Sequence, residues 1–296
     1  MTLLILLLAY IVRRALDSAD RLDPDSFWIR CTRAGSRRAP GKRWQRTTGV
    51  ALLAIPALGL IALNHWLRDS SWSVMIYPLD FLILMLLLGA PGWSGRLAAY
   101  GEAWRRGDMN AAWHHVKSCL RERERGSATA PESLHLALSN RFMATVFERY
   151  FLIMFWYVVG GIGVAFLVRG TLALRDHWPQ RSARPAFGAV VSVLAWLPAR
   201  LLSLSFGVAG DLAGWLSEGR RSVFSPAANH EKVLMTAANG ALTGYALDPV
   251  RFARIHPEDW MNFGGLSLAA IRNLLNRSML VWICALALLV IAGILR

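Results

Sequence analysis

The stretch SMLVWICALALLVIAGIL, residues 278–295, decides the fold class. It holds no charged side chain and is about as long as one helical crossing of a bilayer. Two runs of similar character, 47–67 and 74–90, are joined by the short turn NHWLRDSSWS, so we expect the chain to cross, turn and cross back. The sequence therefore predicts an all-α, polytopic integral membrane helical bundle.

The composition agrees with a protein that is solvated by lipid. Hydrophobic residues make up 55% of the chain, charged residues 18%, and there are thirteen tryptophans, more than an ordinary globular chain needs. The net charge of +14 comes largely from arginine blocks beside apolar runs, where retention of positive loops in the cytoplasm explains them. We therefore expect the lipid bilayer as a partner and no nucleic acid. Three cysteines far apart imply no disulfide framework.

Alternation of apolar and basic segments predicts one membrane domain over residues 1–296, with the N-terminus in the periplasm. The N-terminal run lacks a basic start and a cleavage site, so we expect an uncleaved, short first helix. The predicted membrane segments are 1–12, 47–67, 74–90, 150–168, 186–208 and 278–295. The predicted cytoplasmic loops are 13–46, 93–149 and 210–277.

The basic loop 96–149 is long enough to carry helices of its own. Aromatic and aliphatic residues from Leu97 to Leu120 recur near helical spacing, which predicts an amphipathic helix pair broken at Gly107 and Asp108. A second apolar stripe, Leu134, Leu138, Phe142 and Val146, leads without a break into the next apolar run. One helix is therefore expected to begin in the cytoplasm and to enter the membrane.

Three glycines near the end of the run 150–168 weaken its helix. Gly160, Gly161 and Gly163 imply a close helix contact or a break that faces protein or water. The loop that follows, 169–185, carries four arginines although alternation places it in the periplasm. Either the glycine-rich helix re-enters and returns to the cytoplasmic face, or the loop is interfacial and its arginines snorkel. We favour the re-entrant interpretation.

The run 186–208 is interrupted by Pro198 and Arg200, which are costly in mid-membrane because one lacks a backbone donor and the other is charged. One interpretation is a polar, membrane-level cavity in which Arg200 binds an anionic group. The other is that Arg200 lies near an interface and pairs with a carboxylate such as Glu148 or Asp211.

Other kinds of site have little support in the sequence. His114 and His115 are adjacent, so on a helix they diverge, and we expect no metal site. The chain has no phosphate-binding loop and no nucleophile elbow. Asp80 is an intramembrane carboxylate by position, for which transport is the rival function, but no repeat relates the halves of the chain.

Four segments carry a family resemblance: MTLLILLLAYIVRR at residues 1–14, FERYFLIMFWYVVGG at 147–161, WLPARL at 196–201 and NLLNRSMLVW at 273–282. Together they resemble the AmpE family. This resemblance implies a multi-pass protein of the bacterial inner membrane, a signalling modulator linked to β-lactamase induction, antibiotic resistance and cell-wall recycling. It also implies kinship with the CobD/CbiB synthases, which join an aminopropanol unit to adenosylcobyric acid.

The acidic positions distinguish the two relatives. By the resemblance, Ala144 and Thr145 replace a Glu and an Asn of the synthases, Glu148 is kept, and Arg175 stands at their last carboxylate. Arg169 and the Pro198–Arg200 tripeptide match basic features of the synthases, and Ser225 loosely matches a further element. An ATP-using ligase needs carboxylates to hold magnesium beside phosphates, so the synthase reaction is doubtful here.

Two hypotheses follow. The first is a non-enzymatic sensor that binds an anionic ligand, such as a cell-wall fragment or a nucleotide, and acts on an unidentified membrane or cytoplasmic protein. The second is a membrane-embedded, amide-forming ligase, and only this alternative implies ATP and magnesium as cofactors. The candidate ligand-binding residues are Glu148, Gly160, Gly161, Arg169, Pro198, Arg200 and Ser225.

Overall fold

The computed structural model describes residues 2–18, 25–37, 44–70, 72–89, 92–127, 130–225 and 228–293. Every regular element in these ranges is a helix, which confirms the predicted all-α class. Four helical stretches are long and apolar enough to cross a membrane. They are Trp44–Asp69, Pro131–His177, Arg184–Ala209 and Pro257–Ile291. Residues 1, 90, 294 and 295 of the predicted membrane segments lie outside the described residues.

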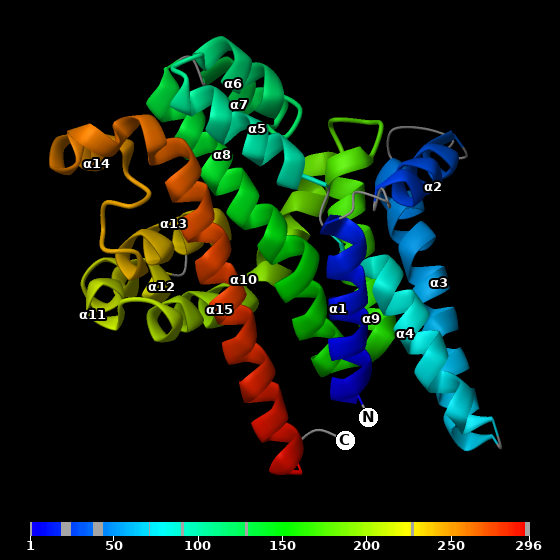
Figure 1. Ribbon diagram of the computed structural model, residues 1–296. Helices are drawn as coiled ribbons and strands as arrows, with labels where there is room; N and C mark the ends of the chain where they lie inside the picture. The colour runs from blue at the N-terminus through cyan, green and yellow to red at the C-terminus, as the bar shows by residue number, and fades with distance from the viewer. Residues whose placement is uncertain are drawn as a thin grey trace. The chain divides into compact units, whose positions relative to one another are not determined.

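The chain divides into two compact units. The first comprises Met1–Pro91, Glu148–Pro198 and Leu286–Arg296. In it, α3 and α4 form a hairpin, visible in Figure 1, while α1 packs on α4, and both α2 and α3 pack on α9. Its elements are α1 (Thr2–Ser18), α2 (Ser26–Arg37), α3 (Trp44–Asp69), η1 (Ser73–Met75), α4 (Ile76–Leu87), α9 (Leu152–His177) and the beginning of α10 (Arg184–Ala209).

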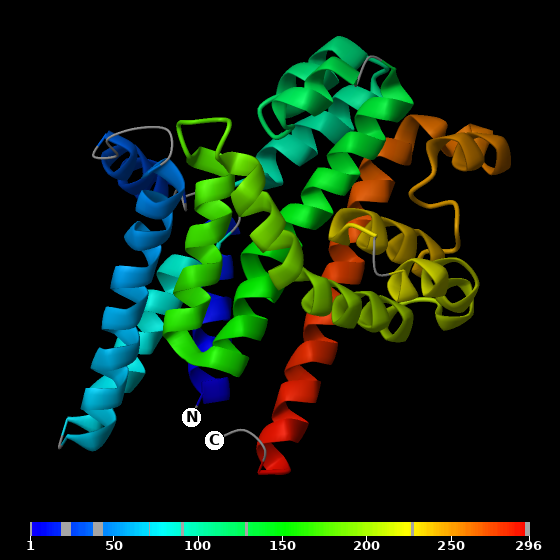
Figure 2. The ribbon, with the colours of Figure 1, turned by 180° about the vertical axis from the view of Figure 1, so that it is seen from behind.

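Helix α9 reverses its direction at Gly161. This residue has φ 73° and ψ −171°, a conformation that essentially only glycine adopts, so the helix is interrupted there. The two halves then run back along each other, because Glu148 before the break pairs with Arg175 after it. Figure 2 shows this green segment descending to the bend and rising again. The predicted glycine break is thus confirmed, and the geometry fits the re-entrant interpretation rather than a straight run over 150–168.

The carbonyl group of Leu194 loses its helical partner because Pro198, four residues later in α10, has no backbone N–H. Trp156 of α9 replaces that partner: its Nε1–H donates to the Leu194 oxygen at 3.1 Å. In lipid, an unsatisfied carbonyl would be costly. The sequence indicates that Pro198 removes a backbone donor, and the structure shows that the Trp156 side chain replaces that donor.

A Trp156→Phe substitution tests this compensation. Phenylalanine keeps much of the packing but leaves the Leu194 oxygen unsatisfied, so we expect the free energy of unfolding to fall by about 1–3 kcal/mol. In a Pro198→Ala background the same substitution should cost much less, because alanine restores the helical donor. Unfolding of the four proteins in mixed detergent micelles measures this cycle, and equal losses in both backgrounds would contradict the assignment.

The second unit comprises Gly92–Phe147 and Ala199–Ala285. The predicted amphipathic pair is confirmed as α5 and α6, separated by a turn in which Gly107 has φ 74°. Helix α8 continues through the π-helical turn η2 (Phe147–Phe151) into α9, as the unbroken apolar stripe predicted. The helices of this unit are α5 (Ser94–Arg105), α6 (Met109–Val116), α7 (Glu122–Ser127), α8 (Pro131–Val146), the end of α10 from Ala199, α11 (Leu212–Gly214), η3 (Trp215–Gly219), α12 (Arg220–Phe224), α13 (His230–Ala241), α14 (Pro249–Ile255), η4 (Pro257–Asn262) and α15 (Phe263–Ile291) as far as Ala285.

A buried histidine ties three helices of this unit together. His135 of α8 lies 3.0 Å from the Tyr100 hydroxyl of α5 and 2.9 Å from the Ser267 hydroxyl of α15. A histidine between a serine and an orienting hydroxyl resembles a nucleophilic arrangement. Ser267 is only 2% exposed and His135 is fully buried, so no substrate reaches them. The group is therefore a structural network.

Candidate functional site

The candidate residues fall into two separate groups. Glu148, Gly160, Gly161, Arg169 and Pro198 belong to the first unit, and Arg200 and Ser225 belong to the second. Within the first unit, the candidates Glu148 and Arg169 each have ionic partners that the sequence did not single out as partners.

The π-helical turn η2 supplies three polar side chains in a row to the interior. Glu148, Arg149 and Tyr150 are between 2% and 7% exposed, although consecutive residues of a regular helix point to different sides. Such π-turns are frequent at functional sites because they redirect side chains locally. Here the turn starts the helix that reverses at Gly161. Glu148 pairs with Arg175 of the returning half, whereas Arg149 binds Asp25 and Tyr150 binds Asp17.

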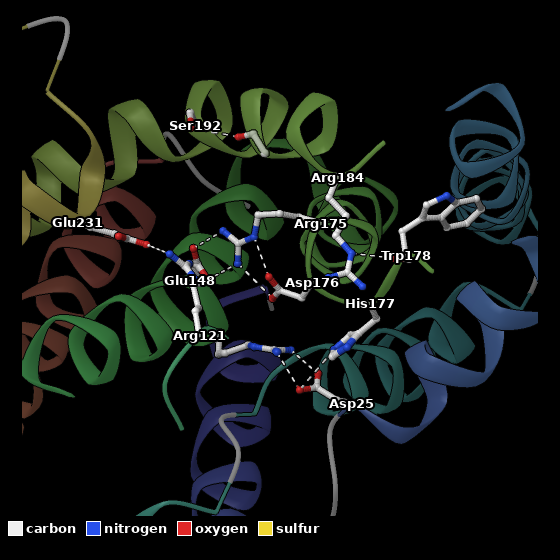
Figure 3. Close-up of polar contacts among 12 residues, drawn as sticks. Asp25, Arg121, Glu148, Arg175, Asp176, His177, Trp178, Arg184, Ser192 and Glu231 are labelled. Carbon is white, nitrogen blue, oxygen red and sulfur yellow. Dashed lines mark hydrogen bonds and ion pairs between the residues drawn. The ribbon is translucent and has the colours of Figure 1, made fainter. Parts of the chain in front are cut away.

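Arg175 of the returning half binds Glu148 with two parallel hydrogen bonds. Nη1 donates to one Glu148 oxygen at 2.5 Å and Nη2 to the other at 2.7 Å. The same guanidinium also donates to Asp176, with Nε at 2.9 Å from Oδ1. Figure 3 shows Arg175 held between the two carboxylates. Glu148 is 2% exposed, and this bidentate geometry is among the strongest that a carboxylate makes.

Asp25, which precedes α2, accepts from two buried guanidinium groups. Its Oδ1 lies 2.8 Å from Arg149 Nη1 and 2.8 Å from Arg169 Nη2, and His177 stands 3.7 Å away, as Figure 3 shows in part. Burial raises the pKa of Asp25, but His177 and the two arginine charges outweigh it and hold that pKa well below its usual value. Arg169 is fully buried, whereas the Asp25 side chain is 16% exposed, so solvent reaches the cluster through Asp25.

A third pair completes the cluster. Arg13 of α1 donates to Asp17 at 2.8 Å, and the Tyr150 hydroxyl donates to the same carboxylate. We call these pairs together the arginine cluster. It contains four guanidinium groups and four carboxylates, from Arg13, Arg149, Arg169, Arg175, Asp17, Asp25, Glu148 and Asp176. The cluster joins α1, the start of α2, η2 and the returning half of α9.

Arg200, in the second unit, binds backbone oxygens. Its Nε donates to the Val223 carbonyl at 2.9 Å and its Nη2 to the Ser225 carbonyl at 2.7 Å. These oxygens lie at the end of α12, where helical partners run out, so the charge also complements the helix terminus. Asp211, one of the predicted partners, accepts from the Ala213 backbone and caps α11. The structure thus brings together Arg200 and Ser225, through the main chain of Ser225; its neighbour Pro226 lies outside the described residues.

Sequence reasoning missed most of the carboxylates that organise the arginine cluster. Asp17 and Asp25 lie in a segment that was considered only for its arginines. Asp176 and His177 lie in a loop that was considered only for its four arginines. Two signals were available. First, a helix that is predicted to fold back brings residues before and after the bend close together. Second, single acidic residues within a basic segment are candidates for ion pairs with arginines.

The fold and the cluster define an all-α membrane protein whose polar interior is built from ion pairs. The family model described as regulatory signalling modulator protein AmpE matches residues 1–245. The chain therefore belongs to the AmpE family, and a regulatory signalling role in a membrane follows from that membership. A search of curated proteins found no match. A search of solved structures found none either.

Proposed function

We propose that this protein is a non-enzymatic, multi-pass sensor of the bacterial inner membrane that modulates β-lactamase induction in response to cell-wall recycling. Its ligand is an anion, a cell-wall fragment or a nucleotide. The ligand binds to Arg149 and Arg169 in exchange for Asp25, and this exchange releases the start of α2 from α9. Release of α2 is the signal that an unidentified membrane or cytoplasmic protein partner receives.

One observation carries this proposal: two buried guanidinium groups converge on the single carboxylate of Asp25, each at 2.8 Å. Two arginines around one carboxylate form the geometry that also recognises carboxylates and phosphates of ligands. Asp25 is partly exposed and comes from another segment of the chain, so an external anion can replace it without unfolding α9. The Asp25 carboxylate then competes with the ligand for the two arginines, and this competition sets the ligand concentration that is needed for binding.

The geometry around Glu148 favours a sensor over a ligase. Glu148 is the acidic residue that the chain shares with the synthase pattern. Arg175 stands where that pattern has another carboxylate, and its guanidinium binds both oxygens of Glu148. Two carboxylates at these positions could share a magnesium ion, whereas a carboxylate and a guanidinium form an ion pair with each other. This supports a regulatory site without a metal platform.

Binding to purified full-length protein in detergent tests the proposal. The probes are a muramoyl tripeptide, and ATP with and without magnesium, each at up to millimolar concentration, and the readout is the thermal unfolding midpoint. We expect the tripeptide or metal-free ATP to stabilise the protein. Arg169→Gln should abolish the shift. Asp25→Asn should strengthen apparent affinity by about tenfold or more, because the competing charge is removed. Glu102→Gln, at an exposed ion pair, is the matched control.

The outcomes separate the alternatives. Absence of binding by both probes, or binding that Arg169→Gln leaves unchanged, contradicts the sensor site. Magnesium-dependent ATP binding that Glu148→Gln abolishes would support the ligase of CobD/CbiB descent instead. A strengthened response of Asp25→Asn, with no effect of magnesium, is the result that only the exchange mechanism predicts.

A further inference from the structure

Helix α2 presents a row of arginines opposite its packed face. Trp28, Thr32 and Gly35 are buried, and they lie on one side of the helix. Arg30, Arg33 and Arg37 are exposed, and their spacing of three, four and seven residues places them together on the opposite side. Among the described residues none of these three arginines forms an ion pair. The helix is thus basic, amphipathic and open on its charged side.

The position of α2 along α3 places it at the depth of the bilayer surface. A Cβ atom added at Gly35 would lie 3.0 Å from Leu52, so the end of α2 packs against that residue of α3. Leu52 is five residues beyond the start of the apolar run 47–67, about 8 Å along the helix. In Figure 1, α2 accordingly lies beside the first turns of α3. An interfacial helix typically sits about 5–10 Å into the boundary of headgroups and acyl chains.

Exposed aromatic residues mark the same level. Phe27 of α2 is 54% exposed and Trp44, the first residue of α3, is 62% exposed. Aromatic side chains that are partly exposed to water are enriched at the membrane–water interface, at the level of the headgroups. On the packed side, the Trp28 ring packs against Phe166 at a tilt and lies under the Arg169 guanidinium, which fixes the orientation of α2. The arginine row therefore faces away from the protein at the depth of phosphate groups.

We propose that α2 is an interfacial helix whose Arg30, Arg33 and Arg37 bind the headgroups of anionic phospholipids. The three guanidinium groups supply charge and hydrogen-bond donors that match phosphate diesters, and Phe27 inserts beside them. This lipid contact uses the face of α2 opposite to the buried face of Trp28, Thr32 and Gly35.

Retention of lipid by the full-length protein tests the proposal. The protein is reconstituted in nanodiscs of phosphatidylcholine with 30% phosphatidylglycerol, released into mild detergent, and the bound phosphatidylglycerol is counted by native mass spectrometry. The test variant carries Arg30→Gln, Arg33→Gln and Arg37→Gln. The control variant carries Arg105→Gln, Arg106→Gln and Arg254→Gln, three exposed arginines at the end of α5 and in α14, so both variants lose the same charge.

We expect the wild type and the control to retain phosphatidylglycerol over phosphatidylcholine, and the α2 variant to bind it on the order of tenfold to a hundredfold more weakly. All three substitutions are at exposed positions, so the thermal midpoint in pure phosphatidylcholine should stay unchanged and report intact folding. Equal retention by the α2 variant and the wild type overturns the proposal. Equal losses in both triple variants also overturn it, because they would indicate an effect of net charge alone.

Discussion

An Asp25→Ala variant is expected to lose about 3–5 kcal/mol of unfolding free energy, because it leaves the buried charges of Arg149 and Arg169 without their shared carboxylate. Removal of one partner from a buried ion pair costs far more than the pair contributes. Urea unfolding in mixed detergent micelles measures the loss. A second variant, Asp25→Ala with Arg169→Met, should recover part of it, since one uncompensated charge is then also removed.

The pH dependence of this loss gives a second test. The pKa of Asp25 is lowered in the folded protein, so its carboxylate stabilises the fold at every pH above the ordinary value near 4. The difference between wild type and Asp25→Ala should therefore stay constant from pH 8 to pH 5. It should shrink only as the pH falls below about 4, where the unfolded chain takes up a proton. A difference that halves between pH 7 and pH 5 would show that Asp25 does not hold the two arginines.

A Gly161→Val substitution is expected to destabilise the protein by about 3 kcal/mol, because a β-branched residue cannot adopt the backbone conformation of the bend. The expected loss comes from backbone strain alone, since an added Cβ would meet no atom within 4 Å at this position. The bend also brings Glu148 to Arg175, so the variant should lose the protection of buried amides near η2. Hydrogen exchange measured by mass spectrometry detects that local opening.

Gly265→Val is the matched control for this substitution. Gly265 lies within α15 at an exposed position where an added Cβ also meets nothing, and its backbone is helical. We expect a change within about 0.5 kcal/mol, since valine is tolerated at an open helical position. If both variants lose the same stability, the cost is that of a larger side chain rather than of the bend at Gly161.

The sequence predicted those parts of the fold that depend on local patterns. The long apolar runs fall in helices, the break at Gly107 separates α5 from α6, and the glycines mark the reversal of α9. Each signal arises from the chemistry of neighbouring residues, namely burial, backbone freedom and helix periodicity. For the run 150–168 followed by the loop 169–185, the reversal itself becomes visible only through contacts between distant residues such as Glu148 and Arg175.

The site was less accessible to sequence reasoning because its partners come from distant segments. Arg169 and Glu148 were singled out as candidate ligand-binding residues, but their ion-pair partners Asp25 and Arg175 depend on how α9 folds back. The π-helical turn at Glu148 has no simple composition signal, although it decides which three side chains point inward. Arg200 was expected to meet negative charge, and the structure shows it on two carbonyl dipoles of a helix end.

The arginine cluster has a consequence for the electrical behaviour of the protein. Its four guanidinium groups and four carboxylates cancel, so the membrane voltage does no net work when these side chains move as one block. One uncompensated charge carried across the full field would instead respond with about 2.3 kcal/mol per 100 mV. The four arginines come from α1, η2 and the returning half of α9. Because their charges are balanced, we expect a joint displacement of the cluster to be insensitive to the membrane potential.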